Sequence, residues 1–324
     1  MKHVLAIDGG GIRGVIPGVL LAHIEDKVGK PISEIFDLIV GTSTGGILAA
    51  GLAVPNARGK PKFSAEDMLQ LYTEEGHEIF SRSFWKGVTS VGGTLDEKYD
   101  EKPLEKLLRQ RMGEATLKDT LTSVVITSYD IEKRAPYFFK SRRAKRSKDR
   151  NHYLRDAARA TSAAPTYFEP EVVRSLAARS TRRVLIDGGV FVNNPAMCAY
   201  SEAIDMGLNP ADMTIVSLGT GTATREIPFE DAKDWGLAGW VRPIISVMMD
   251  GQADSADHHL KELLPWKDEG GKQRYFRFDV ELESALDDMD AAHAANIAAL
   301  KSEAERIMDT QQIEMEHLTK LLRS

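Results

Sequence analysis

The sequence predicts an α/β protein with a mostly parallel central sheet sandwiched by helices, and with a helical C-terminal part. Over the first two-thirds of the 324 residues, short apolar runs alternate with helical patterns, which is typical of strands joined by crossover helices. Two of these runs pass directly into glycine-rich turns, at residues 9–14 and 41–46. After about residue 225 the pattern becomes mostly helical. We therefore expect a core over residues 1–225 and a helical part over 226–324 that packs on the same domain.

Individual elements follow from the spacing of apolar residues. Strands are expected at residues 4–7, 36–40, 123–127, 184–186, 214–218 and 275–279. Pro17 opens the first long helix, because proline is well placed in a first helical turn. Further helices are expected at residues 47–53, 65–79, 103–111, 154–162, 195–206, 291–307 and 313–322. The stretch 235–264 also has a mostly helical pattern, with an interruption at Pro243.

Composition narrows the class of function. Hydrophobic residues make up 42% of the chain and charged residues 28%, as in ordinary globular proteins. The formal net charge is −6, whereas nucleic-acid binding usually needs a basic excess, so we expect no nucleic-acid partner. The single cysteine, Cys198, excludes an internal disulfide framework and a cysteine-based zinc site. No secretory signal is visible and no apolar stretch reaches about 18 residues, so we expect a cytoplasmic protein.

A candidate nucleophile lies in the second glycine-rich turn. Residues 41–45 read Gly-Thr-Ser-Thr-Gly and fit the pattern Gly-x-Ser-x-Gly. A serine between strand and helix must make a sharp, strained turn, and Gly41 and Gly45 remove the clashes that a Cβ would cause there. The Ser43 hydroxyl would then stand above a helix N-terminus, whose dipole favours developing negative charge. A loop without chemistry is the alternative, and the strand before the turn and the small-residue helix after it weigh against that.

The first glycine-rich turn, Asp8 to Gly14, also fits Gly-x-Gly-x-x-Gly, the dinucleotide fingerprint. That fingerprint needs an acidic residue after the second strand, where this chain has Gly-Thr-Ser-Thr-Gly instead. The better interpretation is an oxyanion hole, in which consecutive glycines turn backbone N–H groups toward one point. The candidate oxyanion-binding residues are Gly9, Gly10, Gly11, Arg13 and Thr44. Among them Gly10 and Gly11 are the preferred donors, and Arg13 either holds the loop, adds charge near the oxyanion, or is a solvated arginine.

The candidate base is Asp187. The apolar strand 184–186 delivers its carboxylate to the edge where ligands bind in open α/β sheets, and Gly188 and Gly189 permit a tight turn after it. Taken alone, an aspartate that merely caps a turn would be the simpler explanation. None of the eight histidines lies in a late strand-to-helix loop, where a serine hydrolase would place one. A carboxylate within hydrogen-bond reach could accept the serine proton directly, if burial raised its pKa.

These three elements together resemble the patatin-like phospholipase family. The family pattern is Asp-Gly-Gly-Gly-x-Arg-Gly, then Gly-x-Ser-x-Gly, then Asp-Gly-Gly, and it stands here at residues 8–14, 41–45 and 187–189. The segments 157–168, 217–221 and 289–296 are also similar to the family. The resemblance implies a dyad of Ser43 and Asp187, with no metal or other cofactor. It also implies acyl esters of phospholipids, lysophospholipids or galactolipids as substrates, met at a transient membrane surface.

Other features could serve lipid access. The basic run 140–150 could steer the protein to anionic lipid, although a solvated charged loop is the simpler explanation. The apolar stretch 241–249 could line an acyl-chain pocket, act as a lid, or pack in the ordinary core. Phe84 and Trp85 could form an interfacial loop, although ordinary packing is the simpler explanation. Two alternatives to a constitutive hydrolase stay open: an effector phospholipase that needs an activator, and a non-catalytic lipid-binding homologue. The sequence leaves the oligomeric state unknown.

Overall fold

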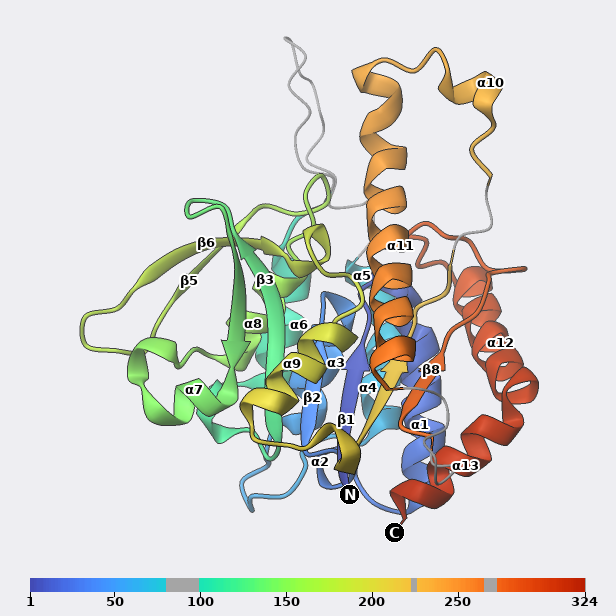
Figure 1. Ribbon diagram of the computed structural model, residues 1–324. Coiled ribbons are helices and arrows are strands. Elements are labelled where there is room, and N and C mark those ends of the chain that lie inside the picture. Colours follow the sequence, from blue (N-terminus) through green and yellow to red (C-terminus); the bar gives the residue numbers. More distant parts are fainter. Residues whose placement is uncertain (80–98, 223–225, 265–272, 324) are drawn as a thin grey trace.

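One mixed sheet runs through the molecule (Figure 1). The computed structural model describes residues 1–79, 99–222, 226–264 and 273–323. In that part of the chain, eight strands form the sheet: β1 (Lys2–Ile7), β2 (Leu38–Gly41), β3 (Ser123–Asp130), β4 (Ala135–Lys140), β5 (Glu171–Arg174), β6 (Arg182–Asp187), β7 (Met213–Leu218) and β8 (Tyr275–Phe278). Their order is β5-β6-β3-β2-β1-β7-β8, with β4 also paired to β3.

The sheet is parallel at its centre and antiparallel at one end. Strands β3, β2, β1, β7 and β8 are parallel neighbours. Strands β4 and β6 both run antiparallel to β3, and β5 runs antiparallel to β6. The predicted fold class is confirmed. Strands β4 and β5 were not predicted from the sequence, because β5 is a short edge strand with charged ends and β4 contains a proline.

Helices cover both faces of this sheet. On one face, Leu5 and Ile7 of β1 pack with a layer of helices: α1 (Val15–Val28), α3 (Thr44–Ala53), α4 (Ala65–Thr73), α6 (Lys102–Met112), α8 (Leu154–Thr161), α12 (Ala294–Thr310) and α13 (Gln312–Leu322). On the other face, Val4 and Ala6 pack with α9 (Ala196–Asp205) and the end of α11 (Leu237–Leu263). The alternation along β1 therefore divides the core into two layers, as expected for a strand buried on both faces.

The remaining helices are short, and two helix predictions need correction. Short helices are α2 (Ile32–Ile35), α5 (Gly76–Ile79), α7 (Ser141–Arg146) and α10 (Phe229–Ala232). The helix predicted at 65–79 is two helices, α4 and α5, so the apolar periodicity alone did not reveal the break. Pro243 does not interrupt its helix but lies inside α11. A proline removes a single i→i−4 hydrogen bond, which a helix of 27 residues accommodates.

The C-terminal part shares the sheet with the rest of the chain. Strand β8, residues Tyr275–Phe278, pairs in parallel with β7, and α12 and α13 pack against α1. No helix among the described residues is both long enough and apolar enough to cross a membrane. Phe84 and Trp85, considered above as an interfacial loop, lie outside the described residues.

Candidate active site

Ser43 occupies a strained turn between β2 and α3. Its φ of 53° and ψ of −120° are unusual for a residue with a side chain, and such strain costs of order 1–3 kcal/mol. The turn also requires Gly45, because a Cβ there would lie 2.2 Å from the Ile7 carbonyl oxygen. The Ser43 N–H donates a hydrogen bond to the Thr161 hydroxyl at 2.8 Å, which fixes the turn against α8. The serine thus precedes the first residue of α3, where the helix dipole favours an anion.

Asp187 meets the serine side chain directly. The Ser43 hydroxyl donates to Asp187 Oδ2 at 2.5 Å, and the Gly189 N–H donates to Asp187 Oδ1 at 2.7 Å. Both side chains are buried. Burial raises the pKa of Asp187 to about 7, against the opposing effect of its two hydrogen bonds. A carboxylate with a pKa near neutrality is suited to accept and return a proton in this pH range.

Asp187 reaches this point at the end of an antiparallel strand. The sequence predicts an apolar strand that delivers Asp187 to the ligand-binding edge of the sheet, and this strand, β6, runs antiparallel to β3. Strand β3 runs past the end of β2, whose last residue Gly41 pairs with Ile126. Strand β6 pairs with β3 only along that overhang and ends with Asp187 opposite Ser128. The aspartate therefore approaches the serine from the opposite direction and stops two residues beyond the end of β2.

The glycine loop after β1 lies beside the dyad. A Cβ on Gly9 would lie 3.2 Å from the Ser43 Cβ, so the two turns pack closely. The Gly9 N–H donates to the Asn193 carbonyl oxygen at 3.1 Å and is therefore not free to bind an oxyanion. Among the described residues, the N–H groups of Gly10 and Gly11 have no acceptor. Gly11 has a φ of +59°, and a Cβ there would lie 2.2 Å from the Met289 carbonyl oxygen.

The other glycines of the motifs are close to neighbouring groups. A Cβ would come within 3 Å of another residue at Gly10, Gly14, Gly41 and Gly188, whereas Gly189 leaves more space. Thr44 begins α3, and its hydroxyl donates to the Tyr72 hydroxyl at 2.7 Å. The Thr44 N–H stands at the helix N-terminus, where backbone N–H groups lack intrahelical partners. The structure therefore brings the candidate nucleophile, the candidate base and the candidate oxyanion donors to one place.

Arg13 is a buried structural side chain. Its Nη1 donates to the Gly221 carbonyl oxygen at 2.8 Å and its Nε to the Gly10 carbonyl oxygen at 3.4 Å. The solvated arginine considered above is therefore excluded, since Arg13 is only 6% exposed. Through these bonds Arg13 holds the glycine loop against the turn that follows β7.

No histidine takes part in the described hydrogen bonds of Ser43 or Asp187. His152 is buried, but its ring hydrogen-bonds to the Tyr137 hydroxyl and the Arg174 carbonyl oxygen, and burial lowers its pKa to about 4. His293 caps the start of α12. The adjacent pair His258 and His259 lies in α11, with ring centroids 5.8 Å apart.

An apolar pocket opens beside Ser43. Its lining combines the nucleophile turn and the glycine loop with side chains of the helical layer: Gly11, Ser43, Thr44, Ile47, Leu71, Tyr72, Gly76, Ile79, Leu104, Ser162, Ala164, Tyr167, Phe168 and Met289. The apolar members come from α3, α4, α5 and α6 and from the turn after α8. The cavity measures about 50 Å³, so its lining suits the first part of a hydrocarbon chain whose carbonyl group would lie next to the serine.

Two residues of the site were not recognised from the sequence. Thr161 binds the Ser43 N–H, and it lies in the 157–168 segment that already resembled the family. Asn193 is buried beside the dyad, and its Oδ1 has no hydrogen-bond partner among the described residues. This oxygen lies 2.5 Å from where a Cβ on Gly9 would be and 3.6 Å from that of Gly189. The only signal in the sequence that pointed to Asn193 was its position shortly after the Asp-Gly-Gly motif.

Comparison with known proteins identifies the family of this chain. The model of the family "Patatin-like phospholipase" matches residues 5–200, which include both Ser43 and Asp187. This chain belongs to the patatin-like phospholipase family. Patatin-like protein 4 of Arabidopsis thaliana is 33% identical to it, over 96% of this chain and 84% of that protein. Patatin-like protein 2 of Oryza sativa subsp. indica is 35% identical over 80% and 72%. Patatin-T5 of Solanum tuberosum is 30% identical over 95% and 84%.

Membership of the patatin-like family supports lipid acyl hydrolase activity for this chain and therefore a lipid substrate. The similarity to the plant patatin-like proteins extends beyond the family match at residue 200, so it includes part of the C-terminal region. The resemblance drawn from the three glycine motifs is thereby confirmed.

Proposed function

We propose that this protein hydrolyses fatty acyl esters of phospholipids or lysophospholipids through a dyad of Ser43 and Asp187. The 2.5 Å hydrogen bond from the Ser43 hydroxyl to Asp187 Oδ2, at a strained strand-to-helix turn, carries the proposal. An aspartate that only capped its own turn would need no serine at that distance. Here Asp187 uses one oxygen for the turn, through the Gly189 N–H, and the other for the nucleophile.

In the first half of the reaction, ionised Asp187 takes the hydroxyl proton as Ser43 Oγ attacks the ester carbonyl carbon. The carbonyl oxygen becomes an oxyanion, for which the N–H groups of Gly10, Gly11 and Thr44 are the proposed donors. Loss of one such donor typically costs about 3–4 kcal/mol of transition-state stabilisation. The carbon–oxygen bond to the leaving alcohol then breaks. Asp187 returns its proton to that alcohol, which leaves an acyl-enzyme on Ser43.

In the second half, water replaces the alcohol. Asp187 takes a proton from the water as the water oxygen attacks the acyl carbonyl carbon, and the same N–H groups bind the second oxyanion. When this intermediate collapses, the bond between the acyl carbon and Ser43 Oγ breaks, and Asp187 returns the proton to Ser43 Oγ. The fatty acid is released, and the dyad returns to its resting state. The buried side-chain amide of Asn193 lies next to the dyad and is available to hold the attacking water.

The apolar pocket supports a fatty acyl group as the part of the substrate that is recognised. Side chains such as Ile47, Leu104 and Phe168 would pack along the chain, while its carbonyl group reaches Ser43. A soluble protein substrate offers no such long apolar group. We also propose that the enzyme meets its substrate at a transient membrane surface and is otherwise cytoplasmic.

The proposal is tested by measuring fatty-acid release from phosphatidylcholine vesicles, from lysophosphatidylcholine and from a soluble short-chain ester. Wild type is compared with Ser43→Ala. Ser175→Ala serves as a control, because Ser175 is a buried serine whose hydroxyl, among the described residues, bonds only to Thr181 of the same loop. We expect release by wild type and by the control but not by Ser43→Ala. Turnover of the soluble ester with intact vesicles would favour an activator-dependent enzyme. No turnover by folded wild type of any of the three would favour the non-catalytic homologue.

A further inference from the structure

The N-terminal half of α11 stands away from the body of the protein (Figure 1). Together with α10 it forms an arm, which we define as residues 226–249. Apolar side chains of the arm are unusually exposed for their type: Ile227, Phe229, Trp240, Ile244, Val247 and Met248. Phe229 is 75% exposed and Met248 50%. Core packing, considered above for residues 241–249, is therefore wrong for these side chains.

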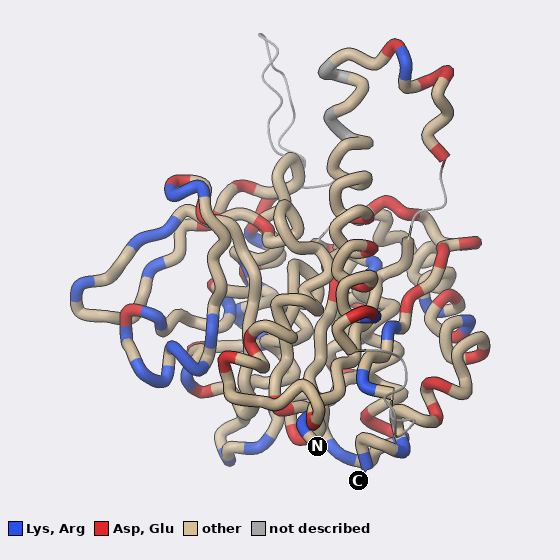
Figure 2. Tube along the Cα trace, in the orientation of Figure 1, with Lys and Arg blue, Asp and Glu red and all other residues tan. Residues whose placement is uncertain are grey.

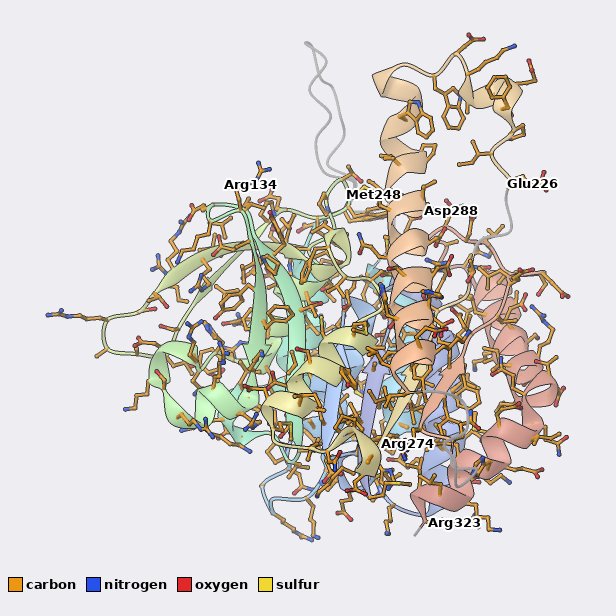
Figure 3. The ribbon with its side chains drawn as sticks, in the orientation of Figure 1. Arg134, Glu226, Met248, Arg274, Asp288 and Arg323 are labelled. Carbon is orange, nitrogen blue, oxygen red and sulfur yellow. The ribbon has the colours of Figure 1, made fainter. Side chains whose placement is uncertain are left out.

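The exposed residues of α11 share one side of the helix. Trp240, Ile244, Val247 and Met248 are spaced by four, three and one residues, which places them along a single stripe. Figure 3 shows Met248 on α11 above the ends of the strands. At the N-terminal end of the stripe, the rings of Trp235 and Trp240 meet edge to face with centroids 5.2 Å apart. Paired tryptophans beside an apolar stripe are typical of segments that enter the interface of a bilayer.

The charge of the arm favours one kind of surface. Residues 226–249 contain four acidic residues and two basic ones, Lys233 and Arg242. Lys233 is paired with Glu230. Figure 2 shows basic residues gathered around α7, on another side of the molecule from the arm. The arm is therefore unsuited to an anionic surface and suited to an uncharged or zwitterionic one.

The basic run 140–150 does not supply an electrostatic contact next to the arm. Its first members are occupied by acids of α9: Lys140 pairs with Glu202, and Arg142 with Glu202 and Asp205. The remaining basic residues lie around α7, away from the arm (Figure 2). Any contact of the arm with lipid must therefore rest on its apolar side chains.

Helix α11 also forms part of the wall of the active site. One turn beyond Met248, Gln252 accepts a hydrogen bond from the Asn193 N–H at 3.2 Å. The carbonyl oxygen of Asn193 in turn accepts the Gly9 N–H at 3.1 Å. Met249 lies 3.7 Å from where a Cβ on Gly189 would be. The helix that carries the exposed stripe is thus anchored on the glycine loop and on the turn that follows Asp187.

We propose that the arm is the docking surface of this enzyme for a zwitterionic phospholipid bilayer, into whose interface its apolar stripe inserts. The choice of a lipid partner rests on the proposed function. The stripe ends one helical turn before Gln252, and an α-helix rises only about 1.5 Å per residue. Insertion of the stripe would therefore place the bilayer within a few helical turns of Ser43 and Asp187. The substrate would then reach the apolar pocket without crossing water. A protein partner or a second copy of this chain would give the same stripe a different occupant, and the test separates these.

The test measures binding to phosphatidylcholine vesicles by co-sedimentation. Binding is measured in the Ser43→Ala background, so that no lipid is hydrolysed. Into this background we would introduce Ile244→Ser, Val247→Ser and Met248→Ser together. The matched control carries Val172→Ser, Ile204→Ser and Leu286→Ser, three comparably exposed apolar residues outside the arm. We expect the arm variant to lose at least about 100-fold in vesicle affinity and the control to lose little.

Three results would overturn the proposal. One is equal vesicle affinity of the arm variant and the control. Another is binding that needs anionic lipid and disappears in about 0.5 M salt, because it would place the contact on charges. The third is a lipid-free dimer, seen by sedimentation velocity, that the arm variant converts to monomer. If the triple variant fails to fold, Ile227→Ser with Phe229→Ser tests the same arm outside α11, with the same expected direction.

Hydrolysis separates this inference from the proposed function. When the arm substitutions are made in the protein that retains Ser43, we expect hydrolysis of the soluble ester at the wild-type rate. We expect hydrolysis of vesicle lipid to be at least about 10-fold slower than that of wild type. Equal loss on both substrates would contradict docking, since it would reveal damage to the catalytic residues. If wild type hydrolyses neither substrate, the proposed function fails, and the vesicle-binding comparison still decides whether the arm docks.

Discussion

Arg277, on the edge strand β8, forms an ion pair with Asp8, the first residue of the glycine loop. Its Nη2 lies 2.7 Å from Asp8 Oδ2 and 2.5 Å from Asp279 Oδ2, and its Nη1 donates to the Ser217 hydroxyl at 2.8 Å. Asp8 is almost fully buried. The C-terminal part of the chain therefore supplies the charge that holds the start of the glycine loop.

Arg277→Met should destabilise the protein strongly, because it leaves the Asp8 carboxylate buried without its partner. We expect a loss of about 3–5 kcal/mol in the free energy of unfolding, measured by denaturant titration. The control is Arg182→Met, which removes an exposed pair with Glu132 and should cost under about 1 kcal/mol. Asp8→Asn combined with Arg277→Met should recover part of the loss. A cost for Arg277→Met as small as that of the control would show that the pair does not hold the loop.

The pH dependence of the reaction should follow Asp187. Burial raises the pKa of this carboxyl to about 7, and only its ionised form can take the Ser43 proton. For the soluble ester, kcat/KM should rise about tenfold per pH unit below the pKa and level off above about pH 7. The measurement is an initial-rate profile between pH 5 and 9. A flat profile over this range would be incompatible with Asp187 as the base.

The same pKa has a consequence for stability. The unfolded carboxyl has a pKa of about 3.9, so between about pH 4 and 7 the folded protein binds the proton more tightly than the unfolded chain. Stability contributed by protonated Asp187 is therefore lost as pH rises through this window. Asp187→Asn carries no such penalty, and its stability relative to wild type should increase by up to about 4 kcal/mol from pH 4 to pH 8. The check is thermal and denaturant unfolding at both pH values, and a difference that does not change with pH would refute the raised pKa.

Backbone strain at Ser43 should be measurable by comparing two substitutions that both remove the hydroxyl. Ser43→Gly relieves the positive φ that Ser43→Ala retains, so the glycine variant should be more stable by about 1 kcal/mol. At Ser246, within α11, the same pair should give the opposite order, because alanine favours a helix over glycine. Melting curves of the four variants settle the point. An alanine variant at 43 as stable as the glycine variant would mean that the turn is not strained.

The parts of this molecule that were predictable from sequence are those with local signals. Strands β1, β2 and β7 are buried on both faces, so their apolar runs identify them, and each glycine motif lies within seven residues. The polar, short β5 carries no such run. The antiparallel entry of β6 depends on its pairing with the overhang of β3, which no local pattern encodes.

Contacts between distant segments were likewise beyond reach. Arg277 and Asp8 are 269 residues apart, and the arginine lies in an ordinary alternating strand. The apolar stretch 241–249 shows a different limit. Helical spacing of apolar residues indicates a face to be covered, but it does not distinguish the core from a lipid surface. The structure decides between these possibilities, because α11 contacts the site at Gln252 while the apolar side chains before it, such as Met248, are exposed.

The measurement closest to the central claim is covalent labelling by a fluorophosphonate, which traps an activated serine. The labelled residue is located by mass spectrometry, and the labelling rate is compared between wild type and Asp187→Asn. The dyad predicts a single adduct on Ser43 and a rate lowered by about 10²–10⁴ in the aspartate variant, the range typical of losing a general base. Labelling of Ser43 at an unchanged rate in folded Asp187→Asn, or labelling of a different residue, would contradict it.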